Sequence, residues 1–182
     1  CVTTDLEDSV ITALQHFLAH DHKEIGLLVG QEETADATPL QMDPRQRSFQ
    51  QFLTEKGLYE ERFVSVGQFS TESGYQMMEQ LIQELGEDLP TAFFMASDAL
   101  AVGALRALQE HQIAVPDRVS LISFNDTSIA KYVFPALSTV TVYTEEMGKQ
   151  AIQMLRQTFQ GSQPSVPYMV KLATKLTIRD SG

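Results

Sequence analysis

Short, nearly continuous apolar stretches, each followed by an amphipathic stretch, recur along this sequence. Residues 25–29, 92–96 and 119–124 are almost uninterrupted apolar runs. Such runs are typical of parallel strands covered on both faces, because a strand with one solvated face alternates apolar and polar residues. Apolar residues three and four positions apart predict helices over residues 5–20, 44–57, 73–85, 98–112 and 145–160. The repeated order of strand and helix predicts an α/β fold with a doubly wound parallel sheet.

Composition and charge exclude several classes of protein. With 182 residues the chain fits one domain of ordinary size. No apolar stretch approaches the roughly 20 residues that span a bilayer, so we do not expect a membrane protein. The net charge of −11 opposes binding of this chain to a phosphate backbone. Cys1 is the only cysteine, which excludes an internal disulfide and a thiolate metal site and suits the cytoplasm.

The carboxyl ends of the expected strands are where a ligand site belongs in an open α/β sheet. Four side chains suited to a polar small molecule follow four of these ends: Arg45, Phe69, Ser97 and Asn125. The planar guanidinium of Arg45 can donate two parallel hydrogen bonds to neighbouring hydroxyls, and Phe69 can stack on the C–H face of a sugar ring. This mixture of polar groups and one aromatic ring predicts a small-molecule cleft.

Each of these residues also has a purely structural interpretation. Arg45 can be a solvated side chain in the first turn of a helix, Phe69 a core aromatic, and Ser97 a helix cap. Arg47 takes the place of Arg45 if the loop register differs by two residues. Asp98 and Asp126 are further candidates, because they directly follow Ser97 and Asn125. Position alone does not decide between these interpretations.

A longer pattern resembles the lactose/galactose-repressor family of bacterial transcriptional regulators. It begins with Asp5, His22, Lys23, Ile25, Gly30, Arg45 and Phe49, continues with Ser97, Asp98, Ala99, Leu100, Ala101, Val102, Gly103, Ala104 and Leu105, and ends with Pro116, Asp117, Val119, Ser120, Ile122, Phe124, Asn125, Asp126, Pro135, Leu137, Ser138, Thr139, Val140, Met147 and Gly148. The likeness covers essentially the whole chain in the right order. Within the family, Phe69, Ser70, Ser73 and Gly74 and the stretch 122–126 most resemble the regulator of the evolved β-galactosidase, which implies a galactose-type effector.

The resemblance implies the fold of a type I periplasmic binding protein, with one lobe nearly complete and the other mostly missing. The C-terminal lobe then covers residues 1–141, a remnant of the N-terminal lobe residues 142–164, and a strand returning to the C-terminal lobe residues 165–182. The helix over residues 145–160 is expected to lack the sheet that would cover its apolar side.

The resemblance also implies a role for each candidate residue. Arg45 takes the place of the family's effector-binding arginine, Phe69 of the aromatic under the ligand, and Ser97 of the polar group at the third strand end. Asn125 stands where the family has an effector-contacting carboxylate, and Val142 stands where some members have a polar contact. These two departures leave the identity of the sugar undetermined, but a cleft is still expected.

A pairing surface is implied as well. Val102, Leu105, Tyr132 and Phe134 resemble the surface through which family members dimerise, with burial against the chain's own sheet as the alternative. The implied partners are therefore a sugar effector, a second copy of the chain, and operator DNA reached only through an N-terminal helix-turn-helix absent from this chain. No cofactor is expected.

Two other classes of site have weaker support in the sequence. His16, His20 and His22 are spaced like zinc ligands, but the glutamate of a metalloprotease motif is missing, so we expect no metal. There is no nucleophile elbow and no Gly-rich phosphate loop, so we do not expect an enzyme such as a hydrolase or a nucleoside-processing enzyme. The main alternative is a periplasmic sugar-binding protein of a transporter. A signal peptide would favour that alternative, and a helix-turn-helix would favour the repressor.

Overall fold

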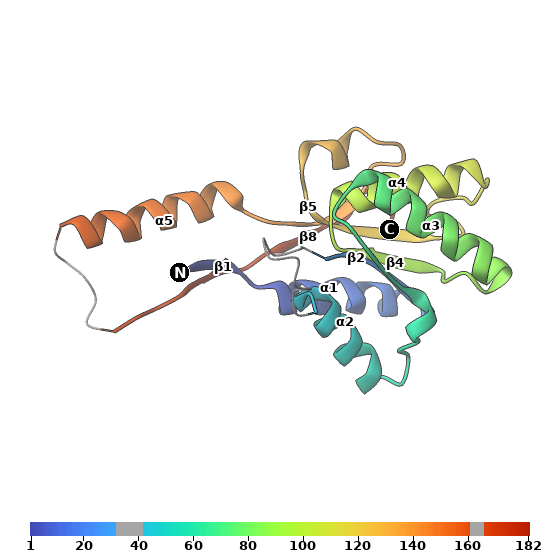
Figure 1. Cartoon of the computed structure of the whole chain (residues 1–182), viewed down its shortest axis with the longest axis horizontal. Helices are drawn as coiled ribbons and strands as arrows, with labels where there is room; N and C mark the ends of the chain where they lie inside the picture. The colour runs from blue at the N-terminus through green and yellow to red at the C-terminus, as the bar shows by residue number, and fades with distance from the viewer. Residues whose placement is uncertain (32–41, 161–165) are drawn as a thin grey trace.

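The protein is described by a computed structural model that covers residues 1–31, 42–160 and 166–182. Its main body is a six-stranded sheet with helices on both faces, and a narrower extension leaves this body at one end (Figure 1). The sheet has the strand order β3-β2-β4-β5-β6-β8. Its strands are β2 (Ile25–Gly30), β3 (Val64–Gly67), β4 (Ala92–Met95), β5 (Ser120–Asn125), β6 (Ser138–Thr141) and β8 (Lys175–Thr177). All pair in parallel except β8, which runs antiparallel to β6, so the predicted α/β fold is confirmed.

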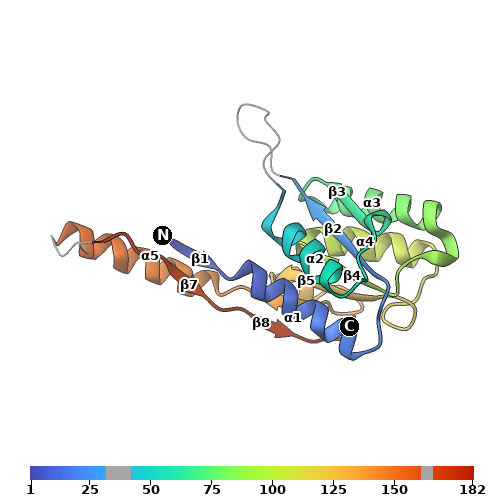
Figure 2. The ribbon, with the colours of Figure 1, turned by 90° about the horizontal axis from the view of Figure 1, so that it is seen from below.

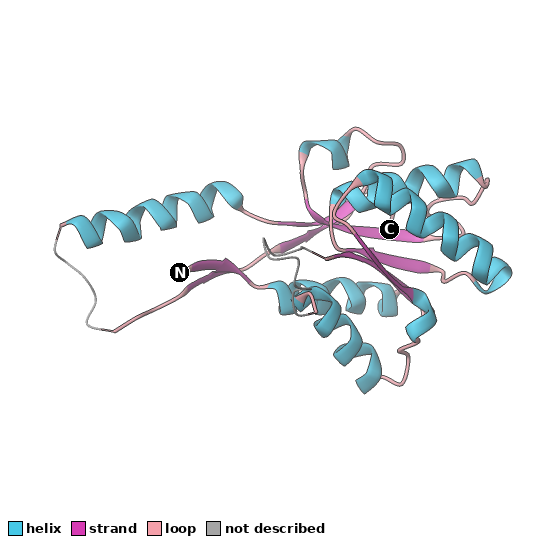
Figure 3. Ribbon diagram, viewed as in Figure 1, coloured by secondary structure: helices cyan, strands magenta, loops and turns pink. Residues whose placement is uncertain are grey.

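Two pairs of helices cover the two faces of this sheet (Figures 1 and 3). One pair is α1 (Leu6–Ala19) with α2 (Pro44–Glu55), and the other is α3 (Thr71–Leu85) with α4 (Asp98–Glu110). Single 3-10 turns lie at Glu61–Phe63, Gly86–Asp88 and Ser128–Lys131. The predicted helix ends agree with the observed ends to within two residues. None of the helices in the described part of the chain has the length and apolarity to cross a membrane.

The apolar runs lie at the centre of the sheet because helices remove both of their faces from water. Every residue of β2 and of β4 is buried, as predicted from their lack of alternation. Phe17 on α1, Phe49 on α2 and Phe93 and Phe94 on β4 are among the largest buried side chains. Burying each such side chain contributes about 1.5–3 kcal/mol to stability.

Helices α3 and α4 approach each other more closely than side chains normally permit. A Cβ atom on Gly103 would collide with the carbonyl oxygen of Thr71, and one on Gly74 would collide with that of Leu100. Glycine is therefore needed at both positions, and the close contact fixes where the two helices begin. Those beginnings, Thr71 and Ser97, lie at the candidate site.

The extension consists of β1 (Val2–Thr4), β7 (Val170–Leu172) and α5 (Thr144–Phe159). Strands β1 and β7 pair in parallel in a sheet of their own, and α5 lies beside them, away from the six-stranded sheet (Figures 1 and 2). The structure thus places β1 beside α5, and the described part of residues 165–182 contains both β7 and β8. The pairing of β1 with β7 is long-range, and no local pattern encodes it. The lobe boundaries at residues 141 and 164 stay a prediction.

Candidate functional site

The four residues predicted from the strand ends line one cleft. Arg45, Phe69, Ser97 and Asn125 surround a cavity of about 590 Å³. The complete lining is Arg45, Phe69, Thr71, Ser97, Asp98, Ala99, Val102, Asn125, Thr127 and Ile129. The parallel strands end at the same edge of the sheet, so residues far apart in the sequence meet there. Arg47 and Asp126 are not part of this lining.

Arg45 lies in the first turn of α2, whose start is encoded locally. Asp43 is the N-cap of α2 and its carboxylate accepts a hydrogen bond from the Arg45 backbone N–H at 2.8 Å, while Pro44 occupies the first helical position. The loop that connects β2 to α2 lies largely outside the described residues, which omit 32–41. Arg47, one half-turn further along α2, is exposed.

The Arg45 guanidinium is held from three sides. Its Nε and Nη2 donate to the two carboxylate oxygens of Asp43 at 2.9 and 2.8 Å, and its Nη1 donates to the carbonyl oxygen of Ala96 at 2.6 Å. The guanidinium carbon also lies 4.9 Å from the ring centre of Phe69 and 5.3 Å from that of Phe124. Salt bridge, hydrogen bond and cation–π contacts together keep this side chain in one orientation.

Phe69 reaches the cleft because the end of β2 has no side chain to block it. A Cβ atom on Gly30 would lie 2.5 Å from the Phe69 ring, so the ring rests on the glycine backbone. The next residue, Ser70, is the N-cap of α3 and accepts from the Ser73 backbone N–H at 3.1 Å. The aromatic ring is therefore fixed by its packing on one strand and by the start of the next helix.

Ser97 caps α4 and leads into a buried carboxylate. Its hydroxyl oxygen accepts from the backbone N–H of Leu100 at 3.3 Å. Asp98 is 1% exposed and accepts hydrogen bonds from Ser123 Oγ at 2.5 Å and Thr139 Oγ1 at 3.0 Å, both from neighbouring strands. It also accepts from the backbone N–H and the hydroxyl of Thr127 at 2.6 and 2.8 Å. Asp98 thus ties the start of α4 to β5, β6 and the turn after β5.

Asn125 is the last residue of β5 and leads into that turn in an uncommon backbone conformation. Asn125 and Asp126 have φ angles of 109° and 58°, a region that residues other than glycine rarely adopt. Asp126 is held by Arg179, whose Nη2 donates to it at 2.7 Å, and by the Thr141 hydroxyl at 2.9 Å. The conformation persists because its surroundings determine it, and this places the Asn125 side chain at the cleft.

Three contributors to this geometry were not among the predicted site residues: Asp43, Thr127 and Arg179. An Asp-Pro pair is a recognisable start signal for a helix, so the capping role of Asp43 was accessible from the sequence. Its bidentate contact with Arg45 was not, because a spacing of two residues does not encode side-chain geometry. Arg179 lies 53 positions from its partner Asp126, which hid that contact from sequence reasoning.

The four predicted pairing residues differ in their exposure to solvent. Tyr132 and Phe134 are 84% and 85% exposed, so they form an apolar surface open to a partner. Leu105 is buried in the core of the chain, as in the alternative interpretation. Val102 is partly buried and lines the cleft.

The histidines near the N-terminus engage other groups. His22 Nδ1 lies 2.9 Å from the Thr91 hydroxyl, and the His16 and His20 rings lie 4.3 Å apart. Burial lowers the pKa of His16 and of His22, and the charge of His20 lowers both further. Within the described ranges, no three His, Cys, Asp or Glu side chains are grouped so that they could hold a metal ion.

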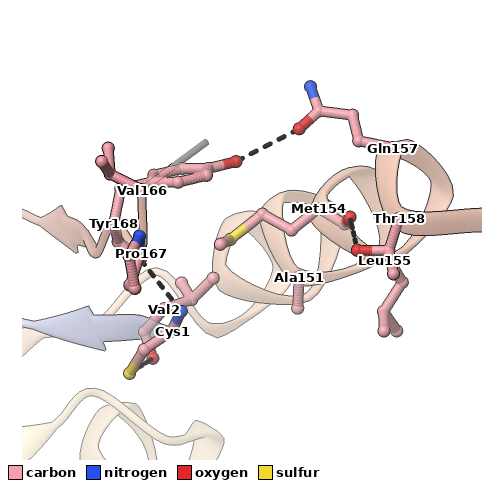
Figure 4. Close-up of a pocket in the computed structure, with 10 residues that line it drawn as sticks. All are labelled: Cys1, Val2, Ala151, Met154, Leu155, Gln157, Thr158, Val166, Pro167 and Tyr168. Carbon is pink, nitrogen blue, oxygen red and sulfur yellow. Dashed lines mark hydrogen bonds between the residues drawn. The ribbon is translucent and has the colours of Figure 1, made fainter. Parts of the chain in front are cut away.

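A second concavity, the apolar groove, lies in the extension between α5 and the β1–β7 pair (Figure 4). It has a volume of about 680 Å³ and is lined by Cys1, Val2, Ala151, Met154, Leu155, Gln157, Thr158, Val166, Pro167 and Tyr168. Tyr168 donates a hydrogen bond to Gln157 Oε1 at 3.1 Å across it. On α5, Ile152, Leu155 and Phe159 are exposed. One side of this helix faces the β1–β7 pair, and these three side chains are left open.

Comparisons with known proteins agree with the fold. Residues 14–182 match the family model described as periplasmic binding protein-like domain. The HTH-type transcriptional regulator GalR of Streptococcus thermophilus is 50% identical over 181 residues, which are 100% of this chain and 54% of that protein. GalR of Lacticaseibacillus casei is 37% identical, with the same coverage. The chain spans about half the length of the curated relatives it matches.

Solved structures of transcriptional regulators contain the same fold. The transcriptional regulator CelR in complex with cellobiose has a TM-score of 0.86 at 27% identity, over 100% of this chain and 53% of that one. The lac repressor dimer bound to operator and the anti-inducer ONPF has a TM-score of 0.86 at 26% identity, over 99% of this chain and 52% of that one.

Proposed function

The chain belongs to the periplasmic binding protein-like family, among the regulators of the lactose/galactose-repressor type, and from this we propose that it is the effector-binding and dimerisation domain of a bacterial transcriptional repressor of galactose or galactoside metabolism. One observation carries the proposal. Four residues to which the family resemblance assigns an effector contact, Arg45, Phe69, Ser97 and Asn125, meet in a single cleft of about 590 Å³. That volume lies within the range of small-molecule sites, roughly 300–1,000 Å³.

The chemistry of the cleft fits a sugar. An immobilised guanidinium, an amide and hydroxyl side chains can donate to and accept from hydroxyl groups, and Phe69 offers a flat apolar surface to the C–H face of the ring. The relatives named above are transcriptional regulators. We propose that this chain likewise binds its ligand without converting it, in the cytoplasm.

The extension fits a second lobe that closes over the cleft. The extension is joined to the main body where β1 leads into α1, β6 into α5 and β7 into β8. The apolar groove and the exposed Leu155 and Phe159 leave apolar surface that further parts of a longer chain would cover. A sugar bound between two lobes changes the regulator only if it binds one arrangement of the lobes more tightly. Operator binding would then depend on a helix-turn-helix outside this chain, since the net charge of −11 opposes contact with DNA.

Dimerisation is proposed through the surface around Tyr132 and Phe134. A two-fold axis places the same patch on both partners, and large exposed aromatic side chains are typical anchors of such interfaces. The lac repressor in the matched structure is a dimer.

The test of this function is calorimetry on the full-length protein with galactose. We expect saturable binding that Arg45→Ala weakens by about 1.5–3 kcal/mol, the loss of a charged hydrogen bond, or roughly 10- to 150-fold in affinity. Arg47→Ala is the matched control, because Arg47 is exposed and does not line the cleft. Equal effects of the two substitutions would contradict the role of Arg45.

A further inference from the structure

The charge of Arg45 is already neutralised inside the protein. Asp43 forms a bidentate ion pair with it, and the two side chains are only 13% and 15% exposed. A pair shielded to this degree is weakly screened by solvent, so its two charges cancel at short range. A ligand in the cleft therefore encounters an oriented donor rather than a free positive charge.

The donors of Arg45 that remain are suited to hydroxyl groups. A guanidinium carries five N–H bonds, and three are used by Asp43 and Ala96. Two are left for a ligand. Their direction is fixed because Asp43 is itself held by its capping bond to the Arg45 backbone and because two aromatic rings pack against the guanidinium.

No other group supplies the missing positive charge among the described residues of the lining. Asp98 is the only other charged residue there, and its hydrogen bonds come from hydroxyls and one backbone N–H rather than from a cation. Asn125 is uncharged. With Asp43 and Arg45 cancelling, Asp98 leaves the cleft with an excess of negative charge, which repels an anion.

The partial positive charge of the helix starts around the cleft is also offset by carboxylates. A helix N-terminus attracts anions through its backbone N–H groups and its dipole. Each of the three helices that begin at the cleft has an acidic residue at its start: Asp43 caps α2, and Glu72 and Asp98 lie in the first turns of α3 and α4. These carboxylates offset the attraction that the helix starts would otherwise exert on phosphate.

We infer that Asp43 is the positioning and specificity-determining residue of this cleft: it orients Arg45 for hydroxyl groups and cancels its charge, so that the cleft accepts uncharged sugars and rejects phosphorylated ones. The inference rests on the proposed function and adds the class of effector. Asp43 acts through Arg45 and is not among the residues that line the cavity.

The experiment is calorimetry on the full-length protein with galactose and with galactose 6-phosphate. We expect the wild type to bind galactose at least about tenfold more tightly. Asp43→Asn frees the charge of Arg45 and should shift the ratio of the two affinities toward the phosphate by about tenfold. Asparagine also caps helices well, so the start of α2 is preserved. Asp43→Ser, another good cap, should shift the ratio in the same direction.

Asp5→Asn is the matched control. Asp5 caps α1 and forms an ion pair with Lys171 at 2.8 Å, so it repeats the local chemistry of Asp43 away from the cleft. A purely structural role would lower both affinities together, whereas the inference requires their ratio to change.

The outcomes separate the inference from the proposed function. Galactose 6-phosphate binding to the wild type as tightly as galactose would overturn the inference and leave sugar binding through Arg45 intact. An unchanged ratio in both Asp43 variants would also overturn it. Binding of neither ligand would overturn the inference together with the proposed galactose effector.

Discussion

Removing the buried carboxylate of Asp98 should destabilise the domain more than any exposed acidic residue does. Asp98 is 1% exposed and accepts four hydrogen bonds, from Ser123, from Thr139 and twice from Thr127. Hydrogen bonds to a charged group are worth about 1.5–3 kcal/mol each, but bonds that share one acceptor are not additive. The hydroxyl donors can turn to other acceptors in Asp98→Ala, whereas the backbone N–H of Thr127 cannot.

We therefore expect Asp98→Ala to lower the free energy of unfolding by about 3–5 kcal/mol, as for other broken buried networks. For a domain of this size, 1 kcal/mol shifts Tm by about 2–4 °C, so Tm should fall by roughly 6–20 °C. Asp98→Asn keeps an acceptor for the Thr127 N–H and should lose about half as much. The informative result is which variant loses more free energy of unfolding, because the amide of Asp98→Asn preserves the geometry of the carboxylate but not its charge.

Thermal and urea unfolding, followed by circular dichroism, measure these differences. Asp8→Ala is the matched control, since Asp8 is an exposed acidic residue in the first turn of α1. It should change stability by no more than about 0.5 kcal/mol. A loss below about 1 kcal/mol in Asp98→Ala would show that the network does not hold the turn after β5, and the account of Asn125 given above would fail with it.

Three further predictions concern packing, pH and assembly. Gly103→Ala places a methyl group against the Thr71 carbonyl and should lower the free energy of unfolding by about 1–3 kcal/mol. Gly148→Ala, with open space around it, should be neutral or stabilising. Equal Tm values for the two variants in thermal unfolding would contradict the packing argument. Burial lowers the pKa of His22 below 6.5, so the unfolded chain takes up a proton before the folded chain does as the pH falls through about 6.5, and the stability of the fold should decline between about pH 7 and 5. In measurements of Tm against pH, His22→Gln should flatten this decline. An equal slope in the variant and the wild type would exclude His22 as its source. Phe134→Glu, at an 85% exposed position, should shift the full-length protein from dimer to monomer in sedimentation experiments. It should not lower Tm below that of the free protomer. A dimer that persists in this variant would place the interface elsewhere.

The local pattern of the sequence alone determined the central strands, the helix ends and the edge of the sheet where the cleft lies. The fully buried strands β2 and β4 were predictable from their lack of polar alternation, and the helix ends were predictable to within two residues from caps and periodicity. The rule that ligands bind beyond the carboxyl ends of parallel strands brought Arg45 and Asn125 into one hypothesis, and both line the same cleft. These inferences succeed because period, capping and strand polarity are properties of neighbouring residues.

Other features were decided only by the tertiary structure. The pairing of β1 with β7 joins segments about 168 positions apart, and the ion pair of Arg179 with Asp126 spans 53. For Leu105 the sequence left open a pairing surface or burial, and the structure buries it, because a helical pattern shows which residues share a face but not what covers that face. The bidentate contact of Asp43 with Arg45 depends on side-chain orientation, and two aromatic rings distant in sequence, Phe69 after β3 and Phe124 on β5, pack against the guanidinium. Charge balance in the cleft is therefore a property of packing, since burial and distance, rather than residue type, decide whether a charge remains available to a ligand.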